Sequence, residues 1–215
     1  MYTNVLSIGH RCTSQIAING LKNLGETTPF SWVNCFSSKN ILTILQSDFD
    51  NFLINQLPKK NVDFFQRSKN LHKTEQISFG HYNMSDANTI KSFERKIKRF
   101  KSYLNDEKGN ILFVYINEDY LYNEDYRIYD DENYENLKKI NDYLSEKYPK
   151  LHFTIFNIIF KERENYKNIE NIFYKIDKFK LVDKNPGLRV KIEKIFRDDC
   201  KIILKKYIND KIGSF

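Results

Sequence analysis

Two apolar runs separated by a helical segment constrain the fold of this chain more than any other feature. The runs cover residues 111–116 and 151–160, and such nearly continuous apolar series are typical of strands buried on both faces. Between them, residues from about 132 to 147 carry apolar positions at helical spacing, and Pro149 ends the segment. The order strand, helix, strand predicts two parallel strands joined by a right-handed crossover.

The N-terminal stretch predicts a further strand, a tight turn and a helix. An apolar run at Val5–Ile8 breaks at Gly9, and apolar residues then recur at helical spacing until Gly25, a suitable C-terminal stop. Cys12 therefore falls in the turn or at the first helical positions, where unpaired backbone N–H groups and the helix dipole favour a negative charge. A thiol there should ionise more easily than a buried one.

The other segments complete an alternating pattern of strands and helices. We predict a helix that begins near Ser37 or Ser38, a short extended segment at 76–83, an amphipathic helix at about 88–104, a long loop at 117–131, a short strand at 179–182 and a C-terminal helix at about 188–208. Strands separated by helices in this way indicate an open, mostly parallel sheet with helices on both faces. Since no linker rich in proline, glycine or serine divides the chain, we predict one Rossmann-like α/β domain over residues 1–215.

Composition narrows the function classes. The formal net charge is +7, but the basic residues are scattered among 28 acids, and the densest basic face, at 91–101, lies on the predicted amphipathic helix. No nucleic-acid-binding motif accompanies this face, so we interpret it as a solvated helix surface, and a nucleic-acid partner is disfavoured. No apolar run approaches the roughly 20 residues of a membrane span. We therefore expect a soluble, cytoplasmic protein without a membrane partner.

The cysteine pattern does not predict a disulfide framework or a metal site. Three cysteines are spread along the chain, and neither a CxxC pair nor a Cys/His metal spacing is present. The chain also lacks GxGxxG and GxxxxGK[ST], which gives no support to a dinucleotide site or a P-loop. We expect no cofactor.

The expected sheet brings two polar segments together. Ligands of open parallel sheets bind outside the carboxyl ends of the strands. Gly9–Cys12 and Asn117–Asp119 would both lie at that edge, because each follows a predicted strand. The sequence therefore predicts a candidate site there, with His10 as a second imidazole near the thiol and Arg11 as a group that could bind a substrate anion.

The order of several short motifs resembles a known family. Ser7–Cys12 is followed by a helix, and Pro29–Trp32, Phe79–His81, a basic helix ending at Lys98–Phe100 and Leu112–Val114 come after it. This series is similar to the family named putative papain-like cysteine peptidases, a domain of unknown function. That family shows Ser-Leu-Gly-x-x-Cys, Pro-Phe-Asp-Trp, a His-Asp pair and a Phe-Val strand in this order, and the resemblance covers roughly the first 120 residues.

The resemblance implies a thiol nucleophile at a helix N-terminus and an imidazole base, which here are Cys12 and His81. It also implies an alternative architecture, the papain-like α+β fold, in which a helical half carrying the cysteine packs against an antiparallel sheet carrying the histidine. The chain departs from the family pattern at two positions, because Ser31 and Tyr82 stand where the family has aspartates. The residue that orients the imidazole would then be Asn83, Asp86 or Asn117.

Two classes of function remain open at this stage. A Cys–His pair can carry out acyl transfer as a hydrolase, peptidase or acyltransferase, with helix-terminal N–H groups holding the oxyanion, on an acyl, peptide or sugar-linked substrate. In that case Gly9, His10, Arg11 and Trp32 would contact the substrate. The alternative is a non-catalytic domain with a degenerate site, which binds a glycan or nucleotide between Gly9, Trp32 and the basic helix or serves as an interaction module.

Overall fold

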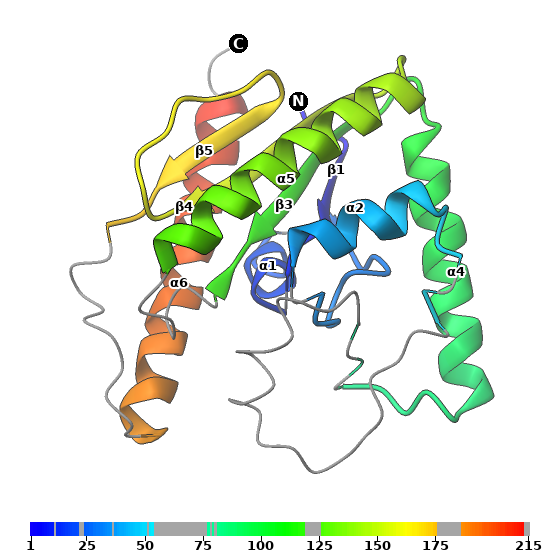
Figure 1. The fold of residues 1–215 in the computed structure, drawn as a ribbon, viewed down its shortest axis with the longest axis horizontal. Coiled ribbons are helices and arrows are strands. Elements are labelled where there is room, and N and C mark those ends of the chain that lie inside the picture. The colour runs from blue at the N-terminus through cyan, green and yellow to red at the C-terminus, as the bar shows by residue number, and fades with distance from the viewer. Residues whose placement is uncertain are drawn as a thin grey trace.

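The computed structural model of the protein describes residues 1–10, 12–21, 24–35, 37–50, 52–53, 77, 79, 81–118, 126–175 and 186–212. The strands within them are β1 (Asn4–Ser7), β2 (Gly25–Glu26), β3 (Asn110–Ile116), β4 (His152–Ile159) and β5 (Ile169–Phe173) (Figure 1). The helices are α1 (Cys12–Ile18), α2 (Ser38–Gln46), α4 (Ala87–Leu104), α5 (Tyr126–Lys147) and α6 (Pro186–Ile212).

The strands form one sheet in the order β2-β1-β3-β4-β5, and every neighbouring pair is parallel. This confirms the predicted α/β class and the parallel arrangement of the three predicted strands. The papain-like alternative is wrong, because β3 and β4 pair in parallel from Asn110↔His152 to Ile116↔Ile158. The strand order 2-1-3-4-5 is that of doubly wound folds of the flavodoxin type, whose switch point lies between β1 and β3.

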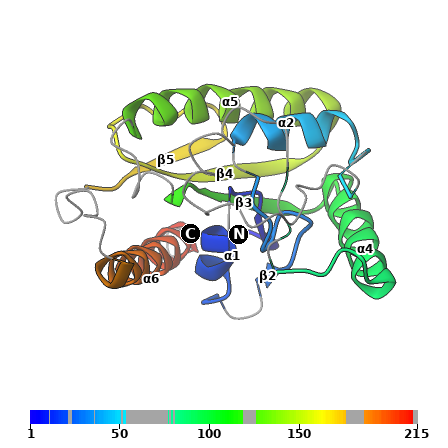
Figure 2. The ribbon, with the colours of Figure 1, turned by 60° about the horizontal axis from the view of Figure 1, so that its bottom comes forward.

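Helices cover both faces of the sheet. α2 and α5 lie over one face, whereas α1 and α6 lie under the other (Figure 2). In β3 the alternate residues Ile111, Phe113 and Tyr115 join the first core, and Leu112, Val114 and Ile116 join the second. This explains why the run is apolar throughout, since a strand covered on both faces has no side that faces water.

The first helix is shorter than predicted. α1 ends at Ile18, and Gly25 does not stop a helix but belongs to β2 beside β1. The periodic signal was misleading because Leu21 and Leu24 pack against the same core from the turn that follows the helix. A Cβ on Gly25 would lie 2.3 Å from Ile18 Cγ2, so this position requires glycine for a close approach.

Other boundaries are confirmed or corrected. α2 begins after an N-cap at Ser37 as predicted, whereas α5 begins at Tyr126, within the segment predicted as a loop. β5 was not predicted, because Glu170 and Asn171 interrupt its apolar residues at the edge of the sheet. The strand predicted at 179–182 lies outside the described residues.

Candidate active site

The turn between β1 and α1 is held by Gly9 and Ser14. A Cβ on Gly9 would lie 1.9 Å from Ser14 Oγ and 3.2 Å from the backbone nitrogen of Ile116. Ser14 Oγ accepts a hydrogen bond from that Ile116 N–H at 2.9 Å. Gly9 therefore lets the turn pack closely on the end of β3, and its predicted contact with substrate stays a prediction.

Cys12 differs from the two other cysteines in its exposure. It is the first residue of α1 and is partly exposed, whereas Cys35 and Cys200 are fully buried. Burial raises the pKa of Cys35 to about 12 and that of Cys200 well above its usual value. Since a thiolate is the reactive form, burial disfavours reaction at these two thiols.

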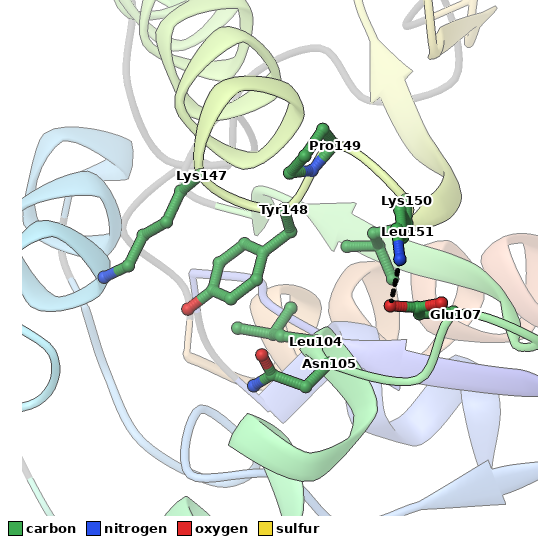
Figure 3. Close-up of a pocket in the computed structure, with 8 residues that line it drawn as sticks. All are labelled: Leu104, Asn105, Glu107, Lys147, Tyr148, Pro149, Lys150 and Leu151. Carbon is green, nitrogen blue, oxygen red and sulfur yellow. Dashed lines mark hydrogen bonds and ion pairs between the residues drawn. The ribbon is translucent and has the colours of Figure 1, made fainter.

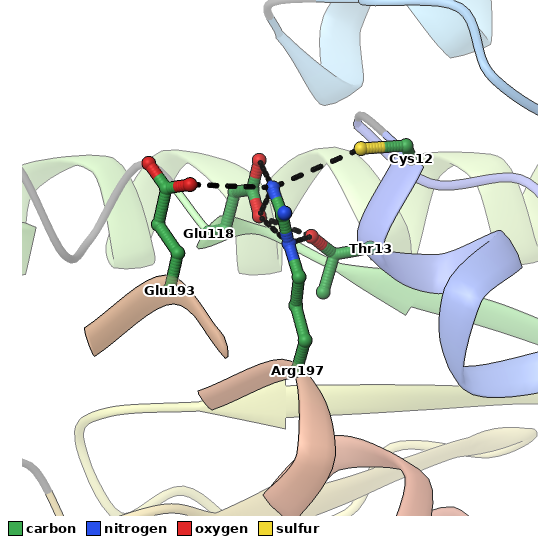
Figure 4. A network of polar contacts seen from close by, with 5 residues as sticks. All are labelled: Cys12, Thr13, Glu118, Glu193 and Arg197. Atoms are coloured by element: carbon green, nitrogen blue, oxygen red, sulfur yellow. Dashed lines mark hydrogen bonds and ion pairs between the residues drawn. The ribbon is translucent and has the colours of Figure 1, made fainter. Parts of the chain in front are cut away.

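A carboxylate and a guanidinium lie next to Cys12 (Figure 4). Arg197 of α6 binds Glu118 through Nη2 at 2.9 Å and Nε at 3.0 Å, and its Nη2 also donates to Cys12 Sγ at 3.9 Å. The hydroxyl of Thr13 donates to the same Glu118 carboxylate. The Glu118 side chain is only 3% exposed, and a charge so buried requires partners of this kind.

Opposing charges meet at Arg197. Burial alone would lower the pKa of its guanidinium, but the facing Glu118 and Cys12 outweigh this and raise the pKa above its ordinary value. Glu193, one turn earlier on α6, lies 3.8 Å from Arg197 Nη2. The cation next to Cys12 is therefore shared with two carboxylates.

Ser31, which replaces the family aspartate, fixes the segment before Trp32. Its hydroxyl accepts from the Thr28 N–H at 2.8 Å and donates to Gln15 of α1, while the Thr28 hydroxyl donates to the carbonyl of Ser7. Trp32 follows with φ of 63°, in the left-handed region that bulky residues seldom occupy. These bonds attach the segment before Trp32 to the end of β1 and to α1.

His81 contacts Trp32, another residue of the site predicted from the family resemblance. The two rings meet edge to face with their centroids 5.9 Å apart, and His81 is exposed. The Cys35 N–H binds the carbonyl of His10 at 2.9 Å, so the segment that follows Trp32 returns to the turn before Cys12. The grouping of all three residues in one site stays a prediction.

Which residue orients the His81 imidazole stays a prediction. Tyr82 packs against Phe93 with ring centroids 4.8 Å apart, the Asn83 side chain accepts from the Ser85 N–H, and Asp86 caps α4. Asn117 is buried directly after β3. Among the described residues, no side chain is hydrogen-bonded to the His81 imidazole.

The other predicted substrate contacts differ in their exposure to solvent. His10 is fully buried, and Trp32 is partly exposed. Arg11 lies outside the described residues.

Sequence reasoning assigned no role to Thr13, Glu118 or Arg197, although the segment 117–119 that it placed at this edge contains Glu118. Glu118 carried a usable signal, because an acidic residue just after a strand buried on both faces lies at the binding edge of a parallel sheet. Arg197 carried none, because it is one of many charged residues on α6 and meets Glu118 across 79 residues of sequence.

A surface pocket of about 260 Å³ lies elsewhere, among residues such as Leu104, Tyr148 and Leu151 (Figure 3). Leu151 precedes β4, whereas Cys12 follows β1, so in a parallel sheet the pocket and the thiol are at opposite edges. Within the described part of the chain, no cluster of three or more His, Cys, Asp or Glu could hold a metal ion. None of the helices described there combines the length and hydropathy needed to cross a bilayer.

The fold and the site define a doubly wound α/β domain with a partly exposed thiol at its switch point. The chain belongs to the family described as putative papain-like cysteine peptidase (DUF1796), whose model matches residues 3–163. This confirms the resemblance drawn from the motifs. Searches of curated proteins and of solved structures found no significant match. The family match ends before β5 and α6, so Arg197 lies outside it.

Proposed function

We propose that the protein is a cysteine-dependent hydrolase or acyltransferase in which Cys12 is the nucleophile and His81 the base. The observation that carries the proposal is the position of Cys12, a partly exposed thiol beside a guanidinium at the switch point of the sheet. Ligands of doubly wound folds bind at this point. The family description supports the same class, a peptidase-like cysteine hydrolase.

The reaction would proceed through a thioester. The imidazole of His81 takes the proton of the Cys12 thiol, and the thiolate sulfur attacks the acyl carbon, whose carbonyl oxygen becomes negative. The bond to the leaving group then breaks, and the imidazolium returns its proton to that group. Water, or an acceptor hydroxyl or amine, attacks the thioester in the second half and restores the thiol.

The role of His81 rests on a chain of contacts. His81 touches Trp32, and Trp32 belongs to the segment that hydrogen-bonds to His10, two residues before Cys12. The hydrogen bonds of a catalytic base are often long before substrate binds. Asn117, at the end of β3, is the group that we assign to orient the imidazole in the substrate complex.

The substrate that we infer carries a reactive acyl group on a peptide or a sugar-linked carrier. Trp32, whose partly exposed ring is held at positive φ, would form the wall of its binding site, and the turn at Gly9–Arg11 would contact its polar part. Strained backbone of this kind costs about 1–3 kcal/mol and is concentrated at ligand-binding positions. A thiol nucleophile is suited to a reducing compartment, so we infer a cytoplasmic location.

A second candidate is a non-catalytic glycan- or nucleotide-binding domain. It is favoured by one observation, the exposed His81 imidazole, to which no described side chain is hydrogen-bonded. A Cys–His catalyst normally has a third group that holds the base in place. In this case Cys12 would line a binding site without reacting.

Labelling with an electrophilic acyl probe distinguishes the two candidates. We expect the probe to modify Cys12, identified by peptide mass spectrometry, and Cys12→Ala to abolish labelling. His81→Gln should slow labelling by about 10²-fold or more, because general base catalysis contributes that much. The matched control is His152→Gln, since His152 is exposed at the opposite edge of the sheet.

The outcomes are separable. Labelling of Cys12 that is slowed by His81→Gln and not by His152→Gln supports the enzyme. Equal labelling in all variants except Cys12→Ala would remove His81 as the base. No labelling of wild-type Cys12 would contradict the proposal and leave the binding domain.

A further inference from the structure

We propose that Arg197 and Glu118 set the reactivity of Cys12 in opposite directions, so that α6 controls the thiol from outside the family-matched segment. Arg197 promotes the thiolate, and Glu118 limits that effect by sharing the guanidinium. The inference deepens the proposed function, because it concerns the regulation of the same nucleophile. Both are positioning residues, since they act through Cys12.

The guanidinium of Arg197 faces the sulfur of Cys12 and two carboxylates at once. Arg197 Nη2 lies 3.9 Å from Cys12 Sγ, 2.9 Å from Glu118 Oε2 and 3.8 Å from a Glu193 carboxylate oxygen. The same nitrogen thus faces the sulfur and both carboxylates. In the view of Figure 4, the guanidinium lies between the two glutamate carboxylates on one side and the sulfur of Cys12 on the other.

Several hydrogen bonds hold Glu118 in this arrangement. Its carboxylate accepts from Arg197 Nε and Nη2 and from the Thr13 hydroxyl, and its side chain is almost fully buried. Thr13 follows Cys12 directly, so Glu118 fixes the first turn of α1 as well as the guanidinium. A bidentate pair of this kind gives strong directional binding, which a lysine would not reproduce.

The charges determine the direction of each effect. An opposite charge within about 4–6 Å favours the ionised form of a group, and a like charge disfavours it. Removing the Arg197 charge would take away the cation that faces the Cys12 sulfur, and the thiolate would become less stable. Neutralising Glu118 would leave more of the guanidinium charge for the sulfur, and the thiolate would become more stable.

The charged groups that the structure describes around Cys12 and Arg197 include side chains from two other parts of the fold. α6 contributes Arg197 and Glu193, and the end of β3 contributes Glu118. On its own segment, His10 is fully buried. Arg11 precedes Cys12 in sequence and is left unchanged in every variant, so its effect is constant.

The test is the rate at which iodoacetamide alkylates Cys12 between pH 6 and 9, measured by mass spectrometry on the full chain. Because the rate follows the thiolate fraction, Arg197→Gln should slow it about tenfold at neutral pH, and its midpoint should move to higher pH. Glu118→Gln should accelerate it and move the midpoint to lower pH. Lys201→Gln is the control, since Lys201 lies one turn further along α6 and pairs with Asp198 at 3.0 Å.

Cys200 reports in the same experiment whether α6 is still docked. It is fully buried on that helix, so its alkylation would show that a variant has loosened the packing. Should this happen with Glu118→Gln, Glu193→Gln is the alternative, because it also removes a carboxylate near Arg197 and should likewise accelerate the alkylation of Cys12. Should it happen with Arg197→Gln, Arg197→Lys keeps the charge without the bidentate pair, so its alkylation rate should lie nearer to wild type than that of Arg197→Gln, and an equal loss of rate in both variants would contradict the role of the charge.

The proposal would be overturned if Arg197→Gln and Glu118→Gln changed the alkylation rate of Cys12 in the same direction while Cys200 stayed protected. Rates equal to wild type in both would do the same. Either result leaves the proposed function intact if the acyl probe still labels Cys12. Conversely, opposite changes in the Cys12 alkylation rate without labelling by the acyl probe would support the control of Cys12 by Arg197 and Glu118 and contradict the proposed enzymatic function.

Discussion

Gly9 lets the chain pass from β1 into α1 at a distance that a side chain would not permit. Its Cα faces Ser14 so closely that a Cβ would lie 1.9 Å from the hydroxyl oxygen. That hydroxyl is the acceptor for the buried Ile116 N–H at the end of β3. One glycine therefore maintains the contact between the turn, the helix that carries Cys12 and the strand that precedes Asn117 and Glu118.

Gly9→Ala should destabilise the protein by about 1–3 kcal/mol, because Ser14 must move and the Ile116 N–H then lacks its acceptor. Urea unfolding at equilibrium measures the change. Gly20→Ala is the matched control, since its Cβ would meet its nearest atom at 3.5 Å, an ordinary contact, and should stay within about 0.5 kcal/mol of wild type. An unchanged unfolding midpoint for Gly9→Ala would show that the turn relaxes freely.

At the scale of elements, α6 both packs on the sheet and carries a residue of the candidate site. One side covers the sheet through Ile192, Phe196, Cys200, Leu204 and Ile208, and the other carries Arg197 to the site. Phe196 is fully buried, and its ring lies 5.4 Å from that of Tyr174. The packing of α6 on the sheet therefore also positions Arg197 next to Cys12.

Phe196→Ala should cost about 3–5 kcal/mol, the usual loss for a buried phenylalanine. Its neighbour Ile195 is 49% exposed and provides the control, since Ile195→Ala should change the stability by about 0.5 kcal/mol or less. Both values come from urea unfolding followed by circular dichroism. A small effect of Phe196→Ala would mean that α6 is not docked as described. A single transition would support the predicted single domain over residues 1–215, which stays a prediction.

The elements that sequence predicted correctly are those whose pattern is local. β3 and β4 were predicted because strands buried on both faces are apolar without interruption. β5 was missed because an edge strand tolerates Glu170 and Asn171. The end of α1 was misplaced because Leu21 and Leu24 reach the core from a turn at spacings that imitate a helix.

At the scale of the molecule, the site could be predicted only in part. The placement of Cys12 and Asn117 at one edge followed from parallel strands, whose carboxyl ends meet. The pairing of Glu118 with Arg197 did not, because it depends on where a helix from the end of the chain lies on the sheet. A local pattern cannot specify such a contact.

The central claim is that the fold activates Cys12 while it protects the other thiols. The direct test is the alkylation rate of each cysteine in the folded chain divided by its rate in the urea-unfolded chain at the same neutral pH. We predict a ratio above one for Cys12, because its position favours the thiolate, and ratios far below one for the buried Cys35 and Cys200. A ratio below one for Cys12, with folding confirmed by protection of the other two, would contradict the account.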